Sequence, residues 1–247
     1  MEQWLEGRVV NKAVWTERLL SLRIAADIEP FEAGQFIKVG LKTGDEIIAR
    51  PYSLVNAPHE RPLEICFSIV PGGPLSRSLA DLDAGDAIWV APRAHGFLIL
   101  GEIAKRPDLW LIATGTGIGP FLSILKTEAP WQQFERIILV HAVRLARELM
   151  YRELINRFSA NQAGKFVYIP FVSGETADYA MPGRITHAIT DGGLELRAGT
   201  QFQPAQSSIV LCGNPQMVKE VQQLLTDRGL KKHRRFDPGN ISVENYW

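Results

Sequence analysis

The stretch "LWLIATGTGIGPFLSILKT", residues 109–127, decides the fold of the second half of this chain. Its first five residues form a continuous apolar run, which predicts a buried strand, and the apolar spacing after Pro120 predicts a helix. Between them, Gly115, Gly117 and Gly119 allow a tight turn whose N–H groups can face a phosphate. The spacing is G-x-G-x-G rather than the dinucleotide fingerprint G-x-G-x-x-G, so a turn that merely joins strand to helix is the alternative.

The same alternation of strand and helix continues to the end of the chain. Alternating strands and helices predict a parallel sheet with helices on both faces, and the ligand of such a sheet binds outside the carboxyl ends of its strands. Strands are expected at 109–114, 136–143, 165–173 and 207–213, and helices at 119–127, 147–158, 183–190 and 215–229.

The first hundred residues have a different pattern. Short runs rich in Val, Ile and Leu are separated by Gly, Pro, Asp and Asn, which predicts a small antiparallel barrel or sandwich. One short helix is expected in "GPLSRSLADL", residues 73–82, with Ser76 as its N-cap. The six expected strands are 7–14, 18–25, 35–41, 46–55, 63–70 and 86–92.

Composition excludes several classes of function. The chain has 247 residues but only two cysteines, Cys66 and Cys212, so it cannot supply the four ligands of an iron–sulfur cluster. No apolar run reaches the roughly 18 residues of a membrane helix, and the acidic start is unlike a signal peptide, so we expect a cytoplasmic protein. Balanced charges, 27 basic and 27 acidic, give little support to nucleic-acid binding. Redox chemistry here would need an organic cofactor.

Charged residues near the strand ends of the second half favour a phosphorylated dinucleotide. In NAD sites an acid near the end of the second strand binds the ribose 2′-OH, whereas an arginine there accommodates a 2′-phosphate. Arg144 ends the strand 136–143, and no acid follows until Glu148. Arg184, at an expected helix start, is a second candidate for phosphate binding. Cys212 should lie at the same carboxyl edge, although a buried cysteine is often only a small hydrophobe.

The barrel half offers a second site. In "ARPYSLVNAPHE", residues 49–60, strand alternation places Arg50 and Tyr52 on one face and Ser53 on the other. Tyr52 can stack on a flat ring, Arg50 can pair with a pyrophosphate, and Ser53 can hydrogen-bond a flavin N5. The following "VPGGPLSRSL", residues 70–79, offers a glycine turn and a helix start as a phosphate cradle. An ordinary half-exposed strand is the alternative.

Taken in order, these motifs resemble one family. "RPYSLVN", "GPLS", "TGTGIGP", "VHAVR", "LCGNPQM" and the terminal "YW" look like the bacterial ferredoxin/flavodoxin–NADP(+) reductases over nearly the whole chain. The resemblance implies an antiparallel six-stranded β-barrel domain for FAD over residues 1–101, followed by an α/β domain with a parallel sheet for NADP(H) over residues 102–247. A monomer is the default expectation, and the five histidines have no spacing that would predict a metal site.

The resemblance assigns roles to individual residues. Tyr52, Ser53 and Cys212 are the expected catalytic residues, close to where nicotinamide and flavin meet. The residues expected to bind FAD are Arg50, Pro51, Tyr52, Ser53, Phe67, Ile69, Gly73, Pro74, Leu75, Ser76, Thr116, Tyr246 and Trp247. Those expected to bind NADP(H) are Gly115, Gly117, Val143, Arg144, Ser173, Arg184, Asn214, Pro215, Gln216 and Met217.

One position departs from the family pattern. In close relatives an arginine after the third strand adds to the 2′-phosphate site, but this chain has Gly174 in "FVSGET". A charge-assisted contact of this kind is worth roughly 1.5–3 kcal/mol. We therefore expect a preference for NADP(H) over NAD(H) that is about tenfold to a hundredfold weaker than the family norm.

The expected reaction is hydride transfer from nicotinamide C4 to flavin N5, followed by one-electron transfer to a separate acceptor. Glu244 is a candidate for a proton route. The segment "RGLKKHRRF", residues 228–236, is either an ordinary solvated face or a docking patch for an acidic ferredoxin or flavodoxin. Its candidate docking residues are Lys231, Lys232, Arg234 and Arg235. A flavin reductase, an oxygenase reductase component and a non-catalytic FAD-binding subunit are the competing interpretations.

Overall fold

The computed structural model describes residues 3–245 and divides into two compact units. The first unit runs to Ile99 and also takes in Gly119–Thr127. The second comprises Leu100–Ile118 and the chain from Glu128 onward. The helix that follows the glycine turn therefore packs with the first unit, although the chain reaches it from a strand of the second.

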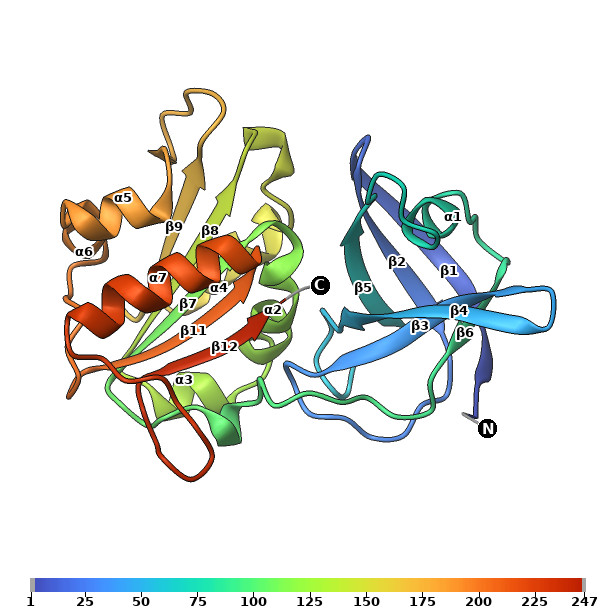
Figure 1. Ribbon diagram of the computed structural model, residues 1–247, viewed down its shortest axis with the longest axis horizontal. Coiled ribbons are helices and arrows are strands. Elements are labelled where there is room, and N and C mark those ends of the chain that lie inside the picture. The colour runs from blue at the N-terminus through green and yellow to red at the C-terminus, as the bar shows by residue number, and fades with distance from the viewer. Residues whose placement is uncertain (1–2, 246–247) are drawn as a thin grey trace. The chain divides into compact units, whose positions relative to one another are not determined.

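The first unit is an antiparallel six-stranded barrel, as the sequence predicts (Figure 1). Its strand order is β4-β3-β6-β1-β2-β5, and a bridge between Leu54 and Ile65 joins the two outer strands and closes the sheet. The elements are β1 (Leu5–Thr16), β2 (Leu19–Ala25), β3 (Phe36–Thr43), β4 (Glu46–Ser53), β5 (Leu63–Ser68), α1 (Ser76–Ala80), β6 (Ala87–Val90) and α2 (Gly119–Leu125).

Alternation along the strands builds the barrel core. In β3, Ile37 and Val39 are fully buried while Lys38 between them is half-buried, because successive side chains point to opposite faces. Burying an aliphatic side chain of this kind stabilises the fold by about 1.5–3 kcal/mol. The same core includes Val9, Leu22, Ile24, Leu54, Leu63, Ile65, Phe67, Leu79, Ile88 and Val90.

The second unit is a six-stranded parallel sheet with the order β10-β9-β8-β7-β11-β12 (Figure 1). Its strands are β7 (Asp108–Thr114), β8 (Arg136–Val143), β9 (Phe166–Val172), β10 (Met181–Pro182), β11 (Ser207–Gly213) and β12 (Ile241–Asn245). Its helices are η1 (Leu100–Glu102), η2 (Gly115–Ile118), α3 (Ala129–Gln133), η3 (Ala146–Glu148), α4 (Arg152–Asn161), α5 (Ile185–Thr190), α6 (Gly193–Ala198) and α7 (Pro215–Asp227).

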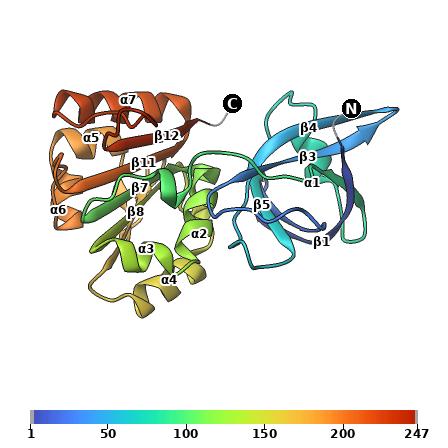
Figure 2. The same cartoon turned by 90° about the horizontal axis from the view of Figure 1, so that it is seen from below.

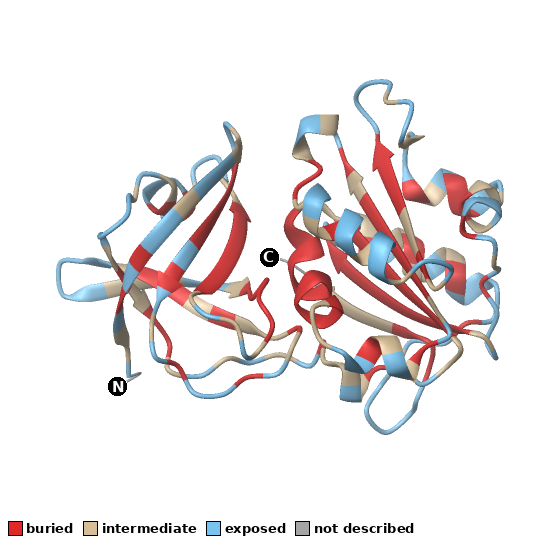
Figure 3. Cartoon of the chain, turned by 180° about the vertical axis from the view of Figure 1, so that it is seen from behind, coloured by how far each residue is buried: buried red, intermediate tan, exposed pale blue. Residues whose placement is uncertain are grey.

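Helices cover both faces of this sheet, which confirms the predicted architecture. Helices α5 and α7 lie on one face, and α3 and α4 lie on the other (Figure 2). Apolar side chains of α5, α6 and α7 form one core cluster with the strands, including Ile189, Leu194 and Val221. The central strands β7 and β11 are buried along almost their whole length (Figure 3), as expected for a parallel sheet covered on both sides.

Two local predictions are wrong. The helix expected at 147–158 is broken, because Tyr151 has a φ of +58° and α4 begins only at Arg152. Leu149 and Met150 are buried there, so tertiary packing overrides helix propensity. Ser76 is not an N-cap: α1 begins at Ser76 after Leu75, and the Ser76 hydroxyl accepts a hydrogen bond from the Val70 N–H over 2.9 Å.

Candidate functional site

The order in which the chain adds strands to the parallel sheet reverses between β7 and β11. The chain runs from β7 outward through β8 and β9, then returns to place β11 on the other side of β7. A reversal of strand order of this kind opens a crevice outside the carboxyl ends of the two strands, which is where open α/β sheets bind their ligands. The glycine turn, residues 115–119, follows β7, and Asn214 follows β11, so both predicted segments lie at the point where the strand order reverses.

The loops after β7 and β11 lie directly against each other. A β-carbon on Gly117 would stand 2.6 Å from the carbonyl oxygen of Cys212, so only glycine allows this approach. Gly213 has a φ of +121°, and a β-carbon there would collide with Thr114. The Thr114 hydroxyl in turn accepts a hydrogen bond from the Asn214 N–H over 2.7 Å. No motif in the sequence points to a role for Thr114 or Gly213, because their contact depends on which strands are neighbours.

A buried histidine supports the glycine turn from within the sheet. His141 on β8 has no solvent exposure, and its Nε2 lies 3.0 Å from the carbonyl oxygen of Gly115. Burial lowers the pKa of His141 to about 4, so the imidazole is neutral at pH 7. Nothing in the sequence pattern singles out His141, because it lies inside an apolar strand.

Hydrogen bonds connect the chain at the ends of β8 and β9, where three of the predicted residues lie, Val143, Arg144 and Ser173. The N–H and hydroxyl of Ser173 both donate to the carbonyl oxygen of Val143, over 3.1 and 3.3 Å. The Gly174 N–H donates to the carbonyl oxygen of Arg144 over 2.7 Å. Arg144 and Ser173 are exposed, whereas the side chain of Val143 is buried, so Val143 can offer a ligand only its backbone. Arg184 is exposed and precedes α5, on the same carboxyl edge beyond β9.

Two carboxylates lie beside Arg144. Glu148 accepts hydrogen bonds from the N–H groups of Arg144 and Leu145, each over 3.0 Å. Glu175 accepts one from the Ala146 N–H over 2.6 Å. The loop after β8 therefore combines an exposed guanidinium with two acids held by backbone N–H groups. The acids weaken the local positive field that would attract a phosphate.

Asn214 begins the longest helix of the second unit. Its side-chain oxygen accepts hydrogen bonds from the N–H groups of Gln216 and Met217, over 2.9 and 3.2 Å, and Pro215 occupies the first helical turn. Asn214 and Gln216 are exposed at the carboxyl edge of β11, while Pro215 and Met217 are half-buried. The four residues predicted to contact a nucleotide are thus held together by one helix cap.

The end of β4 in the barrel brings an aromatic ring and a guanidinium together. The half-buried ring of Tyr52 packs edge-on against Phe67, with 5.9 Å between centroids and 69° between planes. Burial raises the pKa of Tyr52 to about 12, partly offset by the positive charge of Arg50. Arg50 and Pro51 are exposed, so this end of the strand can meet a ligand.

Ser53 is 5% exposed and lies beside the start of α2. A β-carbon on Gly119 would stand 3.9 Å from the Ser53 β-carbon and 3.4 Å from the Cys66 sulfur. The first turn of α2 therefore packs against the part of the barrel that carries Tyr52 and Ser53. Burial is the main reason that the pKa of Cys66 is raised to about 12, so its thiol stays protonated.

The second predicted segment of the barrel is a tight turn. The Gly73 N–H donates to the Val70 carbonyl over 3.0 Å, and Gly72 has a φ of +71°, the geometry of a type II turn with Pro71 leading. The Ser76 hydroxyl accepts from the Val70 N–H and so braces the same turn. Of the remaining predicted residues, Ile69 is half-buried, Pro74 is exposed and Leu75 is buried.

Several predicted residues remain. Thr116 is buried in η2, and Cys212 is fully buried at the end of β11. Glu244 of β12 pairs with Cys212 in the sheet register. The predicted aromatic residues Tyr246 and Trp247 lie outside the described residues.

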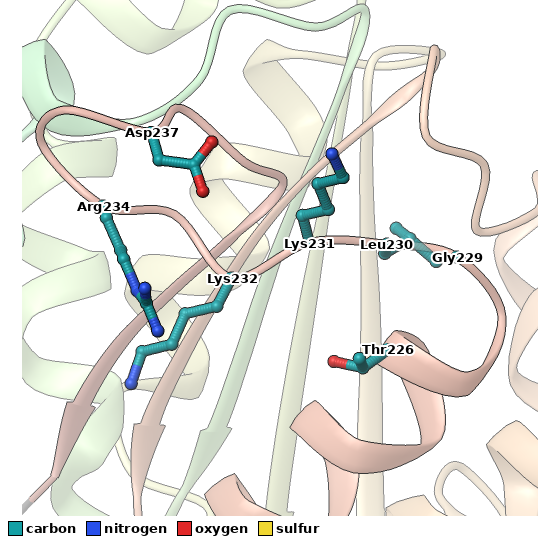
Figure 4. Close-up of a pocket in the computed structure, with 7 residues that line it drawn as sticks. All are labelled: Thr226, Gly229, Leu230, Lys231, Lys232, Arg234 and Asp237. Atoms are coloured by element: carbon teal, nitrogen blue, oxygen red, sulfur yellow. The ribbon is translucent and has the colours of Figure 1, made fainter.

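The basic segment forms a hairpin between α7 and β12. Arg234 and Asp237 exchange backbone hydrogen bonds over 3.1 and 3.0 Å, and Phe236 at the tip is 95% exposed. A hollow of about 450 Å³ opens beside it (Figure 4). It is lined by Thr226, Gly229, Leu230, Lys231, Lys232, Arg234 and Asp237. The four predicted docking residues thus lie on one exposed loop that carries a single acid.

Residues 3–245 contain neither a metal-site cluster nor a membrane-spanning helix. No group of His, Cys, Asp or Glu side chains has the arrangement of a metal site there. No helix in that range is long and apolar enough to cross a membrane.

Comparison with known proteins gives a consistent result. Residues 111–223 match the family described as the oxidoreductase NAD-binding domain. Over their full lengths, the chain is 40% identical to a flavodoxin/ferredoxin–NADP reductase of Buchnera aphidicola and 42% identical to that of Escherichia coli. It also superposes on a ferredoxin–NADP+ reductase from Neisseria gonorrhoeae, solved with bound FAD and NADP. That match has a TM-score of 0.93 at 30% identity and covers all of both chains.

Proposed function

Because this chain belongs to the flavodoxin/ferredoxin–NADP reductase family, we propose that it moves electrons between NADP(H) and a one-electron carrier protein through FAD. The carrier is a ferredoxin or a flavodoxin. The observation that carries the proposal is the contact between the loops after β7 and β11, at the point where the strand order reverses. There Gly117 and Gly213 leave no room for a β-carbon, in a chain that matches these reductases over its whole length.

The barrel has side chains that fit FAD. A flat ring system can stack on Tyr52, whose own ring is fixed by Phe67 at 5.9 Å. The exposed Arg50 is available for a pyrophosphate, together with the backbone N–H groups of Leu75 and Ser76 at the start of α1. Ser53 is the hydroxyl near the flavin N5 in this assignment. The barrel thus combines one aromatic platform with a separate anion site, as a dinucleotide requires.

The chain's own contribution to the reaction is binding and orientation. FAD, when bound, supplies the chemistry: it takes a hydride from NADPH and releases electrons singly. The Gly115–Gly117 turn and the segment Asn214–Met217 hold NADP(H) at the carboxyl edge of the sheet. Tyr52 and Ser53 hold the flavin ring. Most of the rate then comes from fixing two reactants in a productive geometry rather than from acid–base groups of the protein.

Arg144 and Arg184 are the proposed contacts to the 2′-phosphate of NADP(H). Both are exposed at the carboxyl edge of the sheet, and a guanidinium pairs well with a phosphate. Glu148 and Glu175 reduce this advantage, and Gly174 adds no charge. We therefore propose a preference for NADPH over NADH that is present but modest.

The basic hairpin is the proposed docking surface for the carrier. Lys231, Lys232, Arg234 and Arg235 present four positive charges on one exposed loop. Complementary charge on an acidic carrier mainly accelerates association. We place the reaction in the cytoplasm, which fits two buried cysteines, Cys66 and Cys212, that form no disulfide.

The decisive experiment is anaerobic mixing of the purified FAD-containing protein with NADPH or NADH, followed by absorbance near the flavin bands. We expect NADPH to bleach the flavin, with NADH several-fold slower at equal concentration. A flavin that stays oxidised with both would reject the proposed reaction. Cytochrome c reduction with and without added ferredoxin then tests the carrier. A rate of cytochrome c reduction that does not change when ferredoxin is added would instead favour a flavin reductase of the same superfamily.

A further inference from the structure

His141 is a buried polar residue to which the proposed reaction gives no role. It lies in the middle of the sheet, opposite Ala113 of β7 and Pro170 of β9, with no solvent exposure. An imidazole loses its hydration in such a position, and nothing in the strand requires a polar side chain there. The fully buried Leu139, two positions earlier on the same face of the strand, shows what strand packing alone would accept.

The single hydrogen bond of this ring reaches the glycine turn. Nε2 lies 3.0 Å from the Gly115 carbonyl oxygen, and since a carbonyl only accepts, Nε2 must carry the proton. Nδ1 is then an acceptor, and it has no partner among residues 3–245. The imidazole therefore leaves one buried lone pair unsatisfied while it makes one bond to the loop.

That bond fixes the direction of a backbone group. In a planar trans peptide, the carbonyl of Gly115 and the N–H of Thr116 point in opposite directions. Holding the carbonyl toward His141, in the interior of the sheet, therefore turns the Thr116 N–H away from the interior.

Side-chain packing does not supply the same restraint at Gly115. Gly115 has a φ of +53°, and no atom lies within 4 Å of where its β-carbon would stand. The next glycine of the turn, Gly117, is instead wedged against the carbonyl of Cys212. The turn is thus held at its second glycine by close packing and at its first by the imidazole.

We propose that His141 is a positioning residue that acts through Gly115: it orients the backbone of the glycine turn and thereby increases the affinity for the nicotinamide dinucleotide. This inference rests on the proposed function. His141 does not touch the dinucleotide. Because the buried imidazole stays neutral well below pH 7, the same tautomer holds the turn across the physiological range.

The test uses the FAD-containing protein and titration with NADP+, read from the perturbation of the flavin spectrum. His141→Leu keeps a similar volume without a donor, and His141→Gln places an amide N–H at about the reach of Nε2. We expect His141→Leu to raise the Kd for NADP+ by about five- to tenfold, the value of one hydrogen bond. The maximal rate at saturating NADPH should stay within about twofold, and His141→Gln should restore most of the affinity.

Ser208→Ala provides a matched control. Ser208 is fully buried in the same sheet, and its hydroxyl donates to the Ala104 carbonyl. It lies near the amino end of β11, away from the glycine turn. The control also loses one buried side chain-to-backbone hydrogen bond, so it should unfold at a lower temperature but bind NADP+ as the parent does.

Three results would overturn the inference: His141→Leu binding NADP+ like the parent, His141→Leu and His141→Gln being equally weakened, or Ser208→Ala losing as much affinity. Should His141→Leu not fold, His141→Asn takes its place, because its amide stops at the level of Nδ1 and cannot reach Gly115. Parent protein that binds NADP+ and is reduced by NADPH separates these results from a failure of the proposed function. Parent protein that does neither overturns both.

Discussion

A β-carbon on Gly174 would stand 2.7 Å from the carbonyl oxygen of Arg144, the same oxygen to which the Gly174 N–H donates. The same β-carbon would lie 2.9 Å from Cγ of Arg144. The loops after β8 and β9 therefore touch at this pair, and residue 174 cannot gain a side chain unless Arg144 moves. A positively charged side chain at position 174 would therefore move the Arg144 guanidinium as well as add charge.

We expect Gly174→Arg and Gly174→Ala both to weaken NADPH binding, by about three- to tenfold, because each displaces Arg144. Dissociation constants for NADP+ and NAD+ from flavin difference spectra measure the effect, and NAD+ binding should change less. Gly101→Ala is the control, since nothing lies within 4 Å of a β-carbon there. Tighter NADP+ binding by Gly174→Arg would show that the loop yields and that charge alone decides the preference.

Tyr52→Ala should release FAD. Its half-buried ring, fixed by Phe67, is the proposed platform for the flavin, and losing the stacking surface weakens binding by about 1–2 kcal/mol, or roughly five- to thirtyfold in Kd. Tyr52→Phe keeps the ring and should stay within about twofold of the parent. Flavin content after dialysis, read by absorbance, measures both. Full retention of FAD by Tyr52→Ala would show that the flavin does not depend on stacking against Tyr52.

Much of the fold can be predicted from the sequence because strands of the two units carry different periodicities. Alternation, as in Ile37–Lys38–Val39, predicts the half-exposed strands of the barrel, and continuous apolar runs predict the buried parallel strands. The break at Tyr151 could not be predicted, because it arises from packing of Leu149 and Met150. Strand β12, Ile241–Asn245, is too short and too polar to stand out, and it forms only because β11 offers an open edge.

The candidate site was predictable where its residues are close in sequence. The glycines after β7 and the "GNPQM" segment after β11 are recognisable as local motifs. Their mutual contact is not, since Gly117 meets Cys212 only because β7 and β11 are neighbours. The bond between His141 and Gly115 likewise depends on the pairing of β7 with β8, across 26 positions of sequence. Contacts between residues that are far apart in the sequence leave no periodic pattern from which they could be predicted.

Gly117→Ala should weaken NADP+ binding by more than its effect on protein stability would explain. The added β-carbon would meet backbone atoms of Cys212 and Gly213 within 2.8 Å, so the two loops must separate. We expect a loss of NADP+ affinity of about tenfold or more while the barrel keeps its FAD. Gly101→Ala again serves as the control. Unchanged NADP+ affinity in Gly117→Ala would indicate that the loops after β7 and β11 do not form the binding site.

The double change Arg234→Gln with Arg235→Gln should slow electron transfer to ferredoxin by about two- to fivefold at low salt. The difference should shrink as ionic strength rises, because surface charges are screened. Reduction of the flavin by NADPH, followed by stopped flow, should not change. Arg8→Gln with Arg18→Gln removes the same charge from exposed barrel positions and is the control. Equal slowing by both pairs would mean that net charge, and not the hairpin, guides the carrier.

Stability should fall between pH 6.5 and pH 4 because of His141. Burial lowers the folded-state pKa to about 4, whereas the unfolded chain binds the proton near pH 6.5, so in this window the unfolded state binds more protons. The free energy of unfolding therefore drops as pH falls, by about 3 kcal/mol over the window at 1.36 kcal/mol per pH unit. Above pH 6.5 the histidine contributes no slope. The carboxyl of Glu60, whose pKa is lowered from 4.5, affects only more acidic conditions and leaves most of the window to His141.

Urea unfolding at several pH values measures the slope, and His141→Leu should flatten it between pH 5 and 6.5. An equal slope in parent and variant would mean that the imidazole reaches water and is not held against Gly115.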